Sequence, residues 1–339
     1  MPEYYEPVVD AVAQGEENKL VNKALSKLPA PYISGLKLRA DIQLWNPATE
    51  TGLTLNTIDD NNIVWVVSDI DGWWTLPEME IPDLPRGWGD GSYDAIGRWS
   101  NRILTLTGSF LTQEPEDAAT ARNTLMSYLA PMVKTQTAGY LIVDEADPSD
   151  STKVVRRAAK VRLSGVPMIT SVNARGRHDF SIGLKAVDPI KYEFVDGDPD
   201  GYQAVTISTS DLLGTGDVGK VITNIGNTSV PVIFEISDGF EPSGDATISN
   251  GDYDENIVIV GSTDTDVKLE IDTYNREVLD VDYSVVTVDN PDPGVTNARS
   301  KVSVLVDWIY LRPGDNTIIL TGFPSGSSCT VYYRSGWIG

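Results

Sequence analysis

Acidic and glycine-rich segments are the first candidates for chemistry in this sequence. The segment DGDPDG at 196–201 has the order of acids and glycine that opens a calcium-binding loop, because aspartate oxygens and a tight turn suit this hard cation. The residues of the pattern are Asp196, Asp198, Asp200 and Gly201. The pattern then fails, since Ile207 stands where a bidentate Glu is required and Pro199 lies inside the loop. We therefore interpret the segment as a solvated linker.

A second candidate is the loop GWGDGSYDAIG at 87–97, in which glycines surround Asp90. Such a loop could cradle a phosphate, but it has no lysine, no GK[ST] sequence and no helix pattern after it. Its glycines are Gly87, Gly89, Gly91 and Gly97. We interpret them as positions of positive φ or close backbone approach, with Asp90 and Ser92 bonding to the main chain of the turns. The loop is predicted to be architectural.

Nucleophiles and metal ligands are scarce. The single histidine, His178, is in phase with the apolar face of a strand, and the single cysteine, Cys329, lies in the strand pattern CTVYYR. We predict that both are buried, that no cofactor or metal is bound and that the protein is not an enzyme. A carboxylate pair for glycoside hydrolysis stays open, because 49 Asp and Glu residues hide any spatial pairing.

Size and charge limit the function classes. A chain of 339 residues with 41% hydrophobic residues favours two domains with separate cores. A net charge of −23 opposes non-specific binding of nucleic acid. No apolar run is long enough to span a membrane, and the N-terminus lacks the pattern of a signal peptide, so synthesis in a cytoplasm is expected.

Alternating apolar and polar residues predict strands in the first half of the chain. They fall at 36–45, 51–57, 62–68, 102–110, 139–144, 160–165 and 177–192. In the strand at 102–110, one face would bury Ile103, Thr105 and Thr107 and the other Leu104 and Leu106. One helix is predicted at 112–131, ended by Pro131. Its inward stripe would be Ala118, Ala121, Leu125, Met126 and Leu129.

The second half of the chain has many short strand patterns and no helix pattern. They begin after a polar, acidic stretch, which sets a boundary near residue 200. The patterns lie at 204–209, 219–224, 230–237, 246–249, 256–261, 266–272, 277–286, 303–311, 316–322 and 329–337. The fold class is therefore mainly β, a β-rich α+β chain with a sandwich or barrel-like first domain and a β-sandwich second domain.

The order of several motifs resembles the siphophage distal tail protein family, called Dit. In the first half these motifs are LPEMEIPDLPRG, GDGSYDAIGRWSNRILTLTGSF, the helix and KAVDPIKY. In the second half they are NIGNTSVPVIFEI, IDTYNREV, LRPGDNTIILTG and CTVYYRSGWIG. The resemblance covers roughly 33–339 and leaves out the N-terminal arm, 1–32, and the segment near 145–176.

The resemblance implies a structural virion protein at the tail tip, assembled in the host cytoplasm. It implies a homohexameric ring, formed by 33–200, that contacts the tail tube protein, the tail hub and other minor tail proteins. A galectin-like β-sandwich, 201–339, would project outward. Genomic DNA would cross the acidic lumen without specific binding, and nothing would insert into a membrane.

Two sets of residues follow from this comparison. The loop glycines with Asp90, Arg98, Trp99 and Arg102 would take part in ring assembly, and both arginines would bridge acidic loops of neighbouring subunits. The alternative function is a carbohydrate-binding adhesion module that contacts host surface glycans through Trp308 and Tyr332. A galectin-like fold by itself does not establish sugar binding.

Overall fold

The chain forms two compact units. The computed structural model describes residues 42–46, 51–59, 61–81, 84–85, 92–93, 97–112, 114–134, 138–146, 154–171, 176–195, 200–214, 217–286, 293–303 and 307–339. Unit 1 runs to Phe194 and also includes Ile338–Gly339, whereas unit 2 is Val195–Trp337. The prediction of a mainly β chain is confirmed. The predicted N-terminal arm at 1–32 lies outside the described residues.

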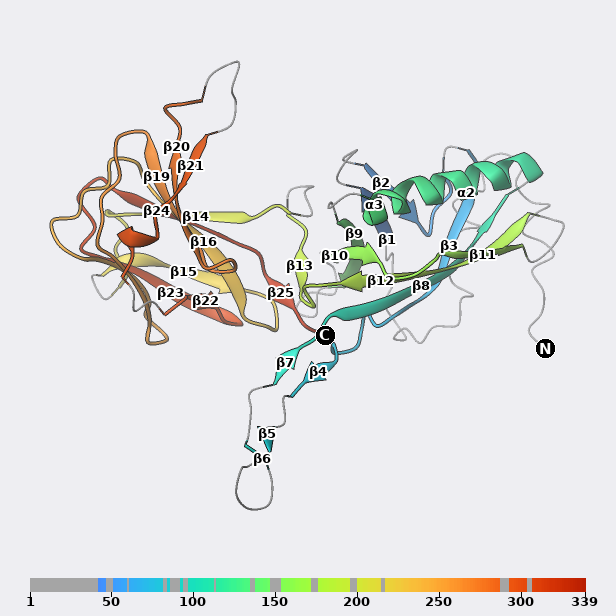
Figure 1. The fold of residues 1–339 in the computed structure, drawn as a ribbon, viewed down its shortest axis with the longest axis horizontal. Coiled ribbons are helices and arrows are strands. Elements are labelled where there is room, and N and C mark those ends of the chain that lie inside the picture. Colours follow the sequence, from blue (N-terminus) through green and yellow to red (C-terminus); the bar gives the residue numbers. More distant parts are fainter. Residues whose placement is uncertain are drawn as a thin grey trace. The chain divides into compact units, whose positions relative to one another are not determined.

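Unit 1 is a curved antiparallel sheet covered by a helix (Figure 1). Its strands are β1 (Ile42–Asn46), β2 (Thr51–Leu55), β3 (Val64–Asp71), β4 (Met79–Glu80), β5 (Leu84–Pro85), β6 (Ser92–Tyr93), β7 (Arg98–Trp99), β8 (Arg102–Leu111), β9 (Gly139–Ala146), β10 (Val154–Leu163), β11 (Met168–Ser171), β12 (Arg177–Ala186) and β13 (Lys191–Glu193). The main path is β2-β1-β9-β10-β12-β8-β3, with β11 beside β12 and β13 beside β10. A bridge between Ile58 and Val64 brings the two ends of this path together, so the sheet curls around its core.

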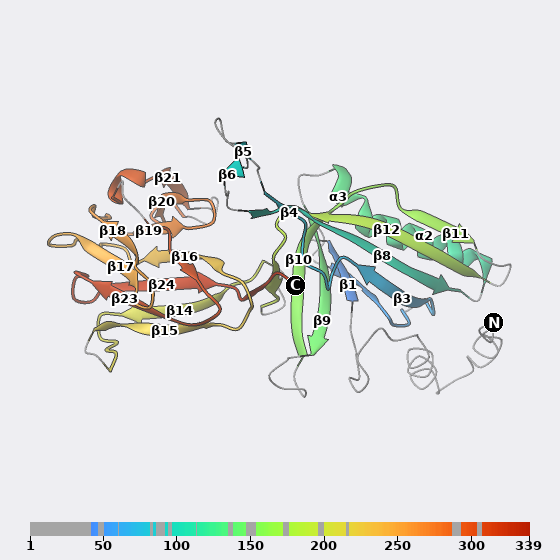
Figure 2. The same ribbon diagram turned by 90° about the horizontal axis from the view of Figure 1, so that it is seen from below.

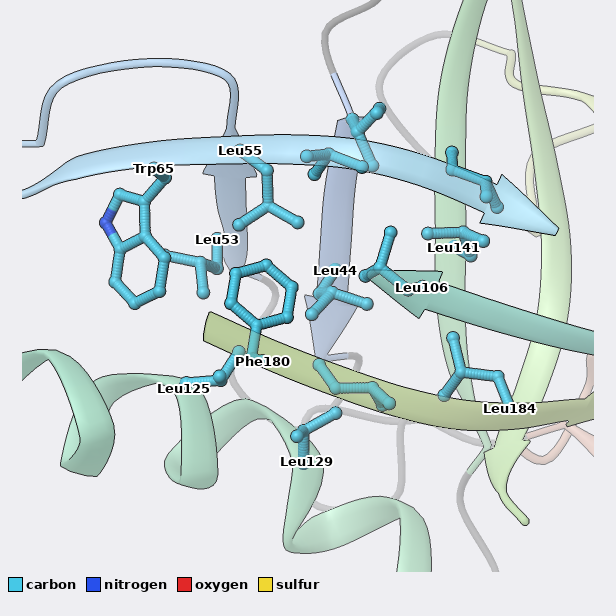
Figure 3. Packing of buried hydrophobic residues seen from close by; sticks show 14 of the residues in the cluster. Leu44, Leu53, Leu55, Trp65, Leu106, Leu125, Leu129, Leu141, Phe180 and Leu184 are labelled. Atoms are coloured by element: carbon cyan, nitrogen blue, oxygen red, sulfur yellow. The ribbon is translucent and has the colours of Figure 1, made fainter. Parts of the chain in front are cut away.

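Helix α2 (Pro115–Leu129) packs on the inner face of the sheet and is followed by the short α3 (Pro131–Lys134). Figure 3 shows Leu125 and Leu129 directed from α2 towards Phe180, Leu44 and Leu184 on the strands. Proline in the first turn suits a helix start, and Glu116 and Asp117 complement the helix dipole there. The helix is thus held mainly by burial of its apolar stripe against the strands.

Three details of unit 1 differ from the predictions. Met126 is exposed rather than inward, because it lies at the edge of the stripe. Pro131 does not only end the helix but also begins α3. Strand β8 buries Leu104, Leu106 and Phe110, whereas Ile103 is 57% exposed. The period of two was predicted correctly in β8, but only one of its faces meets the core.

Unit 2 is a β-sandwich, as the sequence predicts. Its elements are β14 (Gln203–Ser208), β15 (Val218–Asn224), β16 (Val230–Ile236), β17 (Ala246–Asn250), β18 (Glu255–Ile259), β19 (Val267–Asp272), β20 (Glu277–Asp282), β21 (Gly294–Asn297), η1 (Arg299–Lys301), β22 (Tyr310–Leu311), β23 (Gly314–Thr321), β24 (Ser328–Tyr333) and β25 (Gly336–Trp337). One sheet has the order β14-β24-β16-β19-β20-β21 and the other β15-β23-β17-β18. The two sheets lie as two layers (Figures 1 and 2).

Burial alternates along most strands of unit 2, as expected where each sheet turns one face to a shared core. The segment NGDYDEN at 250–256 forms a hairpin turn, since Asn250 pairs with Glu255 across it. The prediction of a strand over 303–311 is wrong for most of its described part, where only Tyr310–Leu311 is a strand. Among the described residues no helix has both the length and the apolar character needed to cross a membrane.

Candidate functional site

A hairpin arm joins β3 to β8 in unit 1, and its described residues are 76–81, 84–85, 92–93 and 97–100. It carries two short ladders, one formed by β4 and β7 and the other by β5 and β6 (Figure 1). In the first ladder Met79 faces Trp99 and Glu80 faces Arg98. The base is closed by the Ser100 amide, which donates to the Glu78 carbonyl at 2.7 Å. The sequence motifs flanking the glycine loop therefore belong to the two strands of one hairpin.

Apolar side chains are exposed along the described part of this arm. Met79 is 50% exposed and Trp99, which faces it, is 41% exposed. Further exposed apolar residues of the arm and its base are Trp74, Leu76, Ile81 and Ile103. A run of large exposed apolar residues on a narrow hairpin is typical of a surface that a protein partner covers.

The absence of a side chain at Gly97 leaves room for apolar residues of this surface. A Cβ at this position would lie 2.6 Å from the Met79 sulfur and 3.2 Å from Ile81 Cγ1, so the missing side chain makes room for both apolar residues. Close approach, one of the two roles predicted for the loop glycines, therefore applies to Gly97. The predicted positions Gly87, Gly89, Asp90 and Gly91 lie outside the described residues, and their assembly role stays a prediction.

Arg102 does not bridge to a neighbouring subunit, because it is 1% exposed. Its Nε donates to the Pro189 carbonyl at 3.0 Å, and Nη1 donates to the carbonyls of Gly72 at 2.9 Å and Thr75 at 2.6 Å. Nη2 donates to the Ile338 carbonyl. The predicted intersubunit bridge is thus wrong for Arg102. Arg98 is exposed, and its bridging role stays a prediction.

Lys191 is a second buried cation beside Arg102. Its Nζ is inaccessible to solvent, donates to the carbonyls of Trp73 at 3.0 Å and Gly339 at 3.2 Å, and lies 3.8 Å from Glu145 Oε1. It also lies 4.9 Å from the centre of the Trp73 ring, a cation–π distance. Burial lowers the pKa of Lys191 to about 8, with Arg102 and Arg157 adding to the shift and Glu145 opposing it.

Glu145 is the carboxylate at the centre of this cluster. Its Oε1 accepts a 2.7 Å bond from Trp73 Nε1, and its Oε2 forms an ion pair with Arg157, which is also buried. We call Arg102, Glu145, Arg157 and Lys191 the buried cation cluster. Sequence reasoning missed all of it except Arg102. The sequence did contain one signal of a buried cation, because Arg102 lies in the same period-two phase as Leu104 and Leu106, which are buried.

The buried lysine makes stability depend on pH. The pKa of Lys191 is about 8 in the folded chain and near 10.5 when unfolded, so between these values the unfolded chain binds more protons. Stability from this group therefore rises as pH rises from 8 to 10.5, by up to roughly 3 kcal/mol. Urea unfolding of the wild type and of Lys191→Met at pH 7 to 10 measures this pH dependence. We expect the free energy of unfolding of the wild type to rise relative to that of Lys191→Met as pH rises. If the two free energies change in parallel with pH, the prediction is contradicted.

The remaining chemical candidates are core residues, as predicted. His178 is buried and stacks on Phe110 with ring centres 4.9 Å apart, and burial together with Arg122 lowers its pKa. Cys329 is fully buried in β24, and burial raises the pKa of its thiol. Neither group is in a position to act as a nucleophile with a solvent-accessible substrate.

The described residues contain no group of three or more His, Cys, Asp and Glu side chains that could hold a metal ion. Of the calcium-like segment, 196–199 lies outside the described residues, and Asp200 lies 3.7 Å from Arg334, within ion-pair distance. The linker interpretation of this segment therefore stays a prediction.

The two candidate glycan contacts have different partners. Trp308 lies under the Arg299 guanidinium at 5.6 Å, whereas the Tyr332 hydroxyl donates to Glu235 at 3.4 Å, and the same carboxylate pairs with Lys268 at 2.9 Å. These separate contacts do not make Trp308 and Tyr332 into one aromatic platform. Sugar binding by either residue stays a prediction.

No protein-family model matches the sequence, and no curated protein matches it. Solved structures of phage proteins are similar to the chain. The Dit protein of phage SPP1, described as a paradigm of the hub adsorption apparatus in phages that infect Gram-positive bacteria, has a TM-score of 0.49 and 13% identity, over 79% of this chain and 93% of that one. Chains of the phage P2 baseplate in its activated conformation have TM-scores of 0.41, with Ca, and 0.43, with Sr. They share 7% and 8% identity, and each match covers 86% of this chain and 97% of the other.

Proposed function

We propose that this chain is a structural protein of a siphophage tail tip, of the distal tail protein family. The proposal is supported by the order of the sequence motifs and by the elements that they form. RILTLTGSF lies in β8, the next motif is helix α2, and IDTYNREV spans the end of β19, a turn and the start of β20. LRPGDNTIILTG spans the end of β22 and β23, and CTVYYR includes most of β24.

The chain acts by binding other proteins rather than by catalysis. Six copies form a ring that joins the tail tube to the tail hub, and the ring is carried in the virion after assembly in the host cytoplasm. The net charge of −23 suits a passage for DNA, because an acidic wall repels phosphates and the genome does not adhere to it.

The exposed apolar surface of the hairpin arm is the observation that carries the assembly role. In a protein with 22% charged residues, Met79 and Trp99 on paired strands and Ile81 directly after β4 are all exposed. Burial of such side chains stabilises an interface by about 25 cal/mol for each Å² of apolar surface removed from water. We infer that a neighbouring subunit or tail protein covers this arm.

Native mass spectrometry of the purified protein tests the ring. We expect a particle of six 36.9-kDa chains, stable on dilution into volatile buffer at near-neutral pH. A chain that remains monomeric at high concentration, in the absence and presence of the tail tube protein, would argue against the proposed function.

A further inference from the structure

The outer face of the unit 1 sheet, which is turned away from the core, carries exposed acidic residues on one strand. Figure 2 shows β3, β8 and β12 side by side, and β10 pairs with β12. On β3, Asp69 and Asp71 are exposed, whereas Ile70 between them is buried in the core. Their partners across the strand pair are Thr107 and Thr105 of β8. We call Asp69 and Asp71 the acidic strip.

A neutral strip on β8 separates these aspartates from a group of cations. The outward residues of β8 carry no charge and are Ile103, Thr105, Thr107 and Ser109. On the far side of β8, Lys185 of β12 lies directly opposite Arg162 of β10. Lys160 shares the outward side of β10 with Arg162, because the core residue Val161 lies between them. We call Lys160, Arg162 and Lys185 the basic strip.

Four more charged residues of this face form two ion pairs. Arg177 lies 3.0 Å from Asp179 on β12, and Arg156 of β10 lies 2.6 Å from Asp144 of β9. Each of these pairs is neutral as a whole. Across β3, β8 and the paired strands β12 and β10, the face therefore changes from negative through neutral to positive.

The position of the basic strip is not explained by folding. Like charges directly opposite each other on neighbouring strands destabilise a sheet. Arg162 and Lys185 are such a pair, in a chain that has 26 Lys and Arg against 49 Asp and Glu. Two of these few cations thus lie where they repel each other, and an acidic partner would offset the repulsion.

A second copy of the chain fits both strips. The net charge of −23 makes two copies repel each other, so a contact between them needs a place where opposite charges meet. DNA would fit the basic strip but would be repelled by the acidic strip, because its phosphates are all negative. Since the sheet curls around its core, the strips on β3 and β10 point in different directions and are able to contact different neighbours.

We propose that the acidic strip of one copy contacts the basic strip of the next copy, and that this head-to-tail contact repeats around the ring. A contact between two different surfaces of the same chain closes into a ring when the rotation between neighbours allows it. The inference rests on the proposed function and adds the surfaces by which unit 1 of each copy meets its neighbours.

Charge reversal of each strip tests this contact in the full-length chain. The acid-reversed variant carries Asp69→Lys and Asp71→Lys, and the base-reversed variant carries Arg162→Glu and Lys185→Glu. Alone, each variant brings like charges together at every contact, so native mass spectrometry should show loss of the six-chain particle. Mixed in equal amounts, the two variants should form rings with three copies of each, because only alternation pairs opposite charges.

The swap variant, with all four substitutions, is the matched control. Two reversals in each direction cancel, so its net charge stays at −23, and it should form rings alone but no mixed rings with the wild type. A further variant, Arg162→Gln with Lys185→Gln, removes charge without adding repulsion. It should weaken each contact by about tenfold, which gives a readout even if a reversed chain fails to fold.

The results distinguish failure of this contact from failure of the proposed function. A wild type that stays monomeric would contradict the proposed function and this contact together. A wild-type ring, with rings formed equally well by each reversed variant alone, would overturn the contact only. The same holds for a mixture or swap variant that stays monomeric although it unfolds at the wild-type temperature, and for a Gln variant that dissociates like the wild type.

Discussion

Replacement of Glu145 by Gln is expected to destabilise unit 1 by about 3–5 kcal/mol, the cost of breaking a buried ion pair by removal of one partner. The glutamine keeps the size of the side chain and an oxygen that accepts from Trp73 Nε1, so packing changes little. It removes the charge that faces Arg157 and Lys191, both of them buried. Urea unfolding followed by tryptophan fluorescence measures the effect, since most tryptophans precede residue 100.

Asp144→Asn is the matched control, because Asp144 precedes Glu145 on β9 and also pairs with an arginine. Its partner Arg156 has a side chain that is 35% exposed, at 2.6 Å from the carboxylate. Water can solvate this arginine when its partner is lost, and we expect a cost of about 1 kcal/mol. Equal losses of unfolding free energy for Glu145→Gln and Asp144→Asn would mean that burial of the cationic partner does not determine how much each ion pair contributes to stability.

The buried cation cluster also shows where prediction from the sequence stops. Period-two alternation placed β8 correctly, because a half-buried strand must alternate whatever it packs against. It also placed β12, although the strand predicted over 177–192 ends at Ala186 and Lys191–Glu193 forms the separate β13. The same period puts Arg102 on the buried face of β8. Its charge argued for exposure, and carbonyls from Gly72 to Thr75, Pro189 and Ile338, all distant in the sequence, reverse that expectation.

The hairpin arm was missed for a different reason. Its described strands are two residues long, and prolines and glycines separate them, so no alternating pattern can develop. The glycine loop suggested a turn, but not that both flanks pair with each other. Pairing of Met79 with Trp99 is a cross-strand contact, which composition alone does not encode.

Trp99→Asp is expected to abolish or strongly weaken assembly while leaving the fold intact. Tryptophan is a common anchor residue in interfaces, and loss of such an anchor costs about 2 kcal/mol or more, which is about 30-fold in affinity for each interface. The new carboxylate would also have to be buried, or would keep the partner away. Native mass spectrometry at a fixed chain concentration should show monomers or small oligomers in place of the ring.

Exposure explains why this variant separates assembly from folding. Trp99 is 41% exposed in the single chain, so its replacement removes little of the core, and the thermal unfolding midpoint should stay close to that of the wild type. Val166→Asp is the control, since Val166 is 88% exposed and lies between β10 and β11, outside the arm. It introduces the same charge into the same unit and should assemble normally. If both variants assemble like the wild type, the arm is not an interface. If both fail equally, added negative charge rather than loss of the tryptophan prevents assembly of a chain that already carries −23.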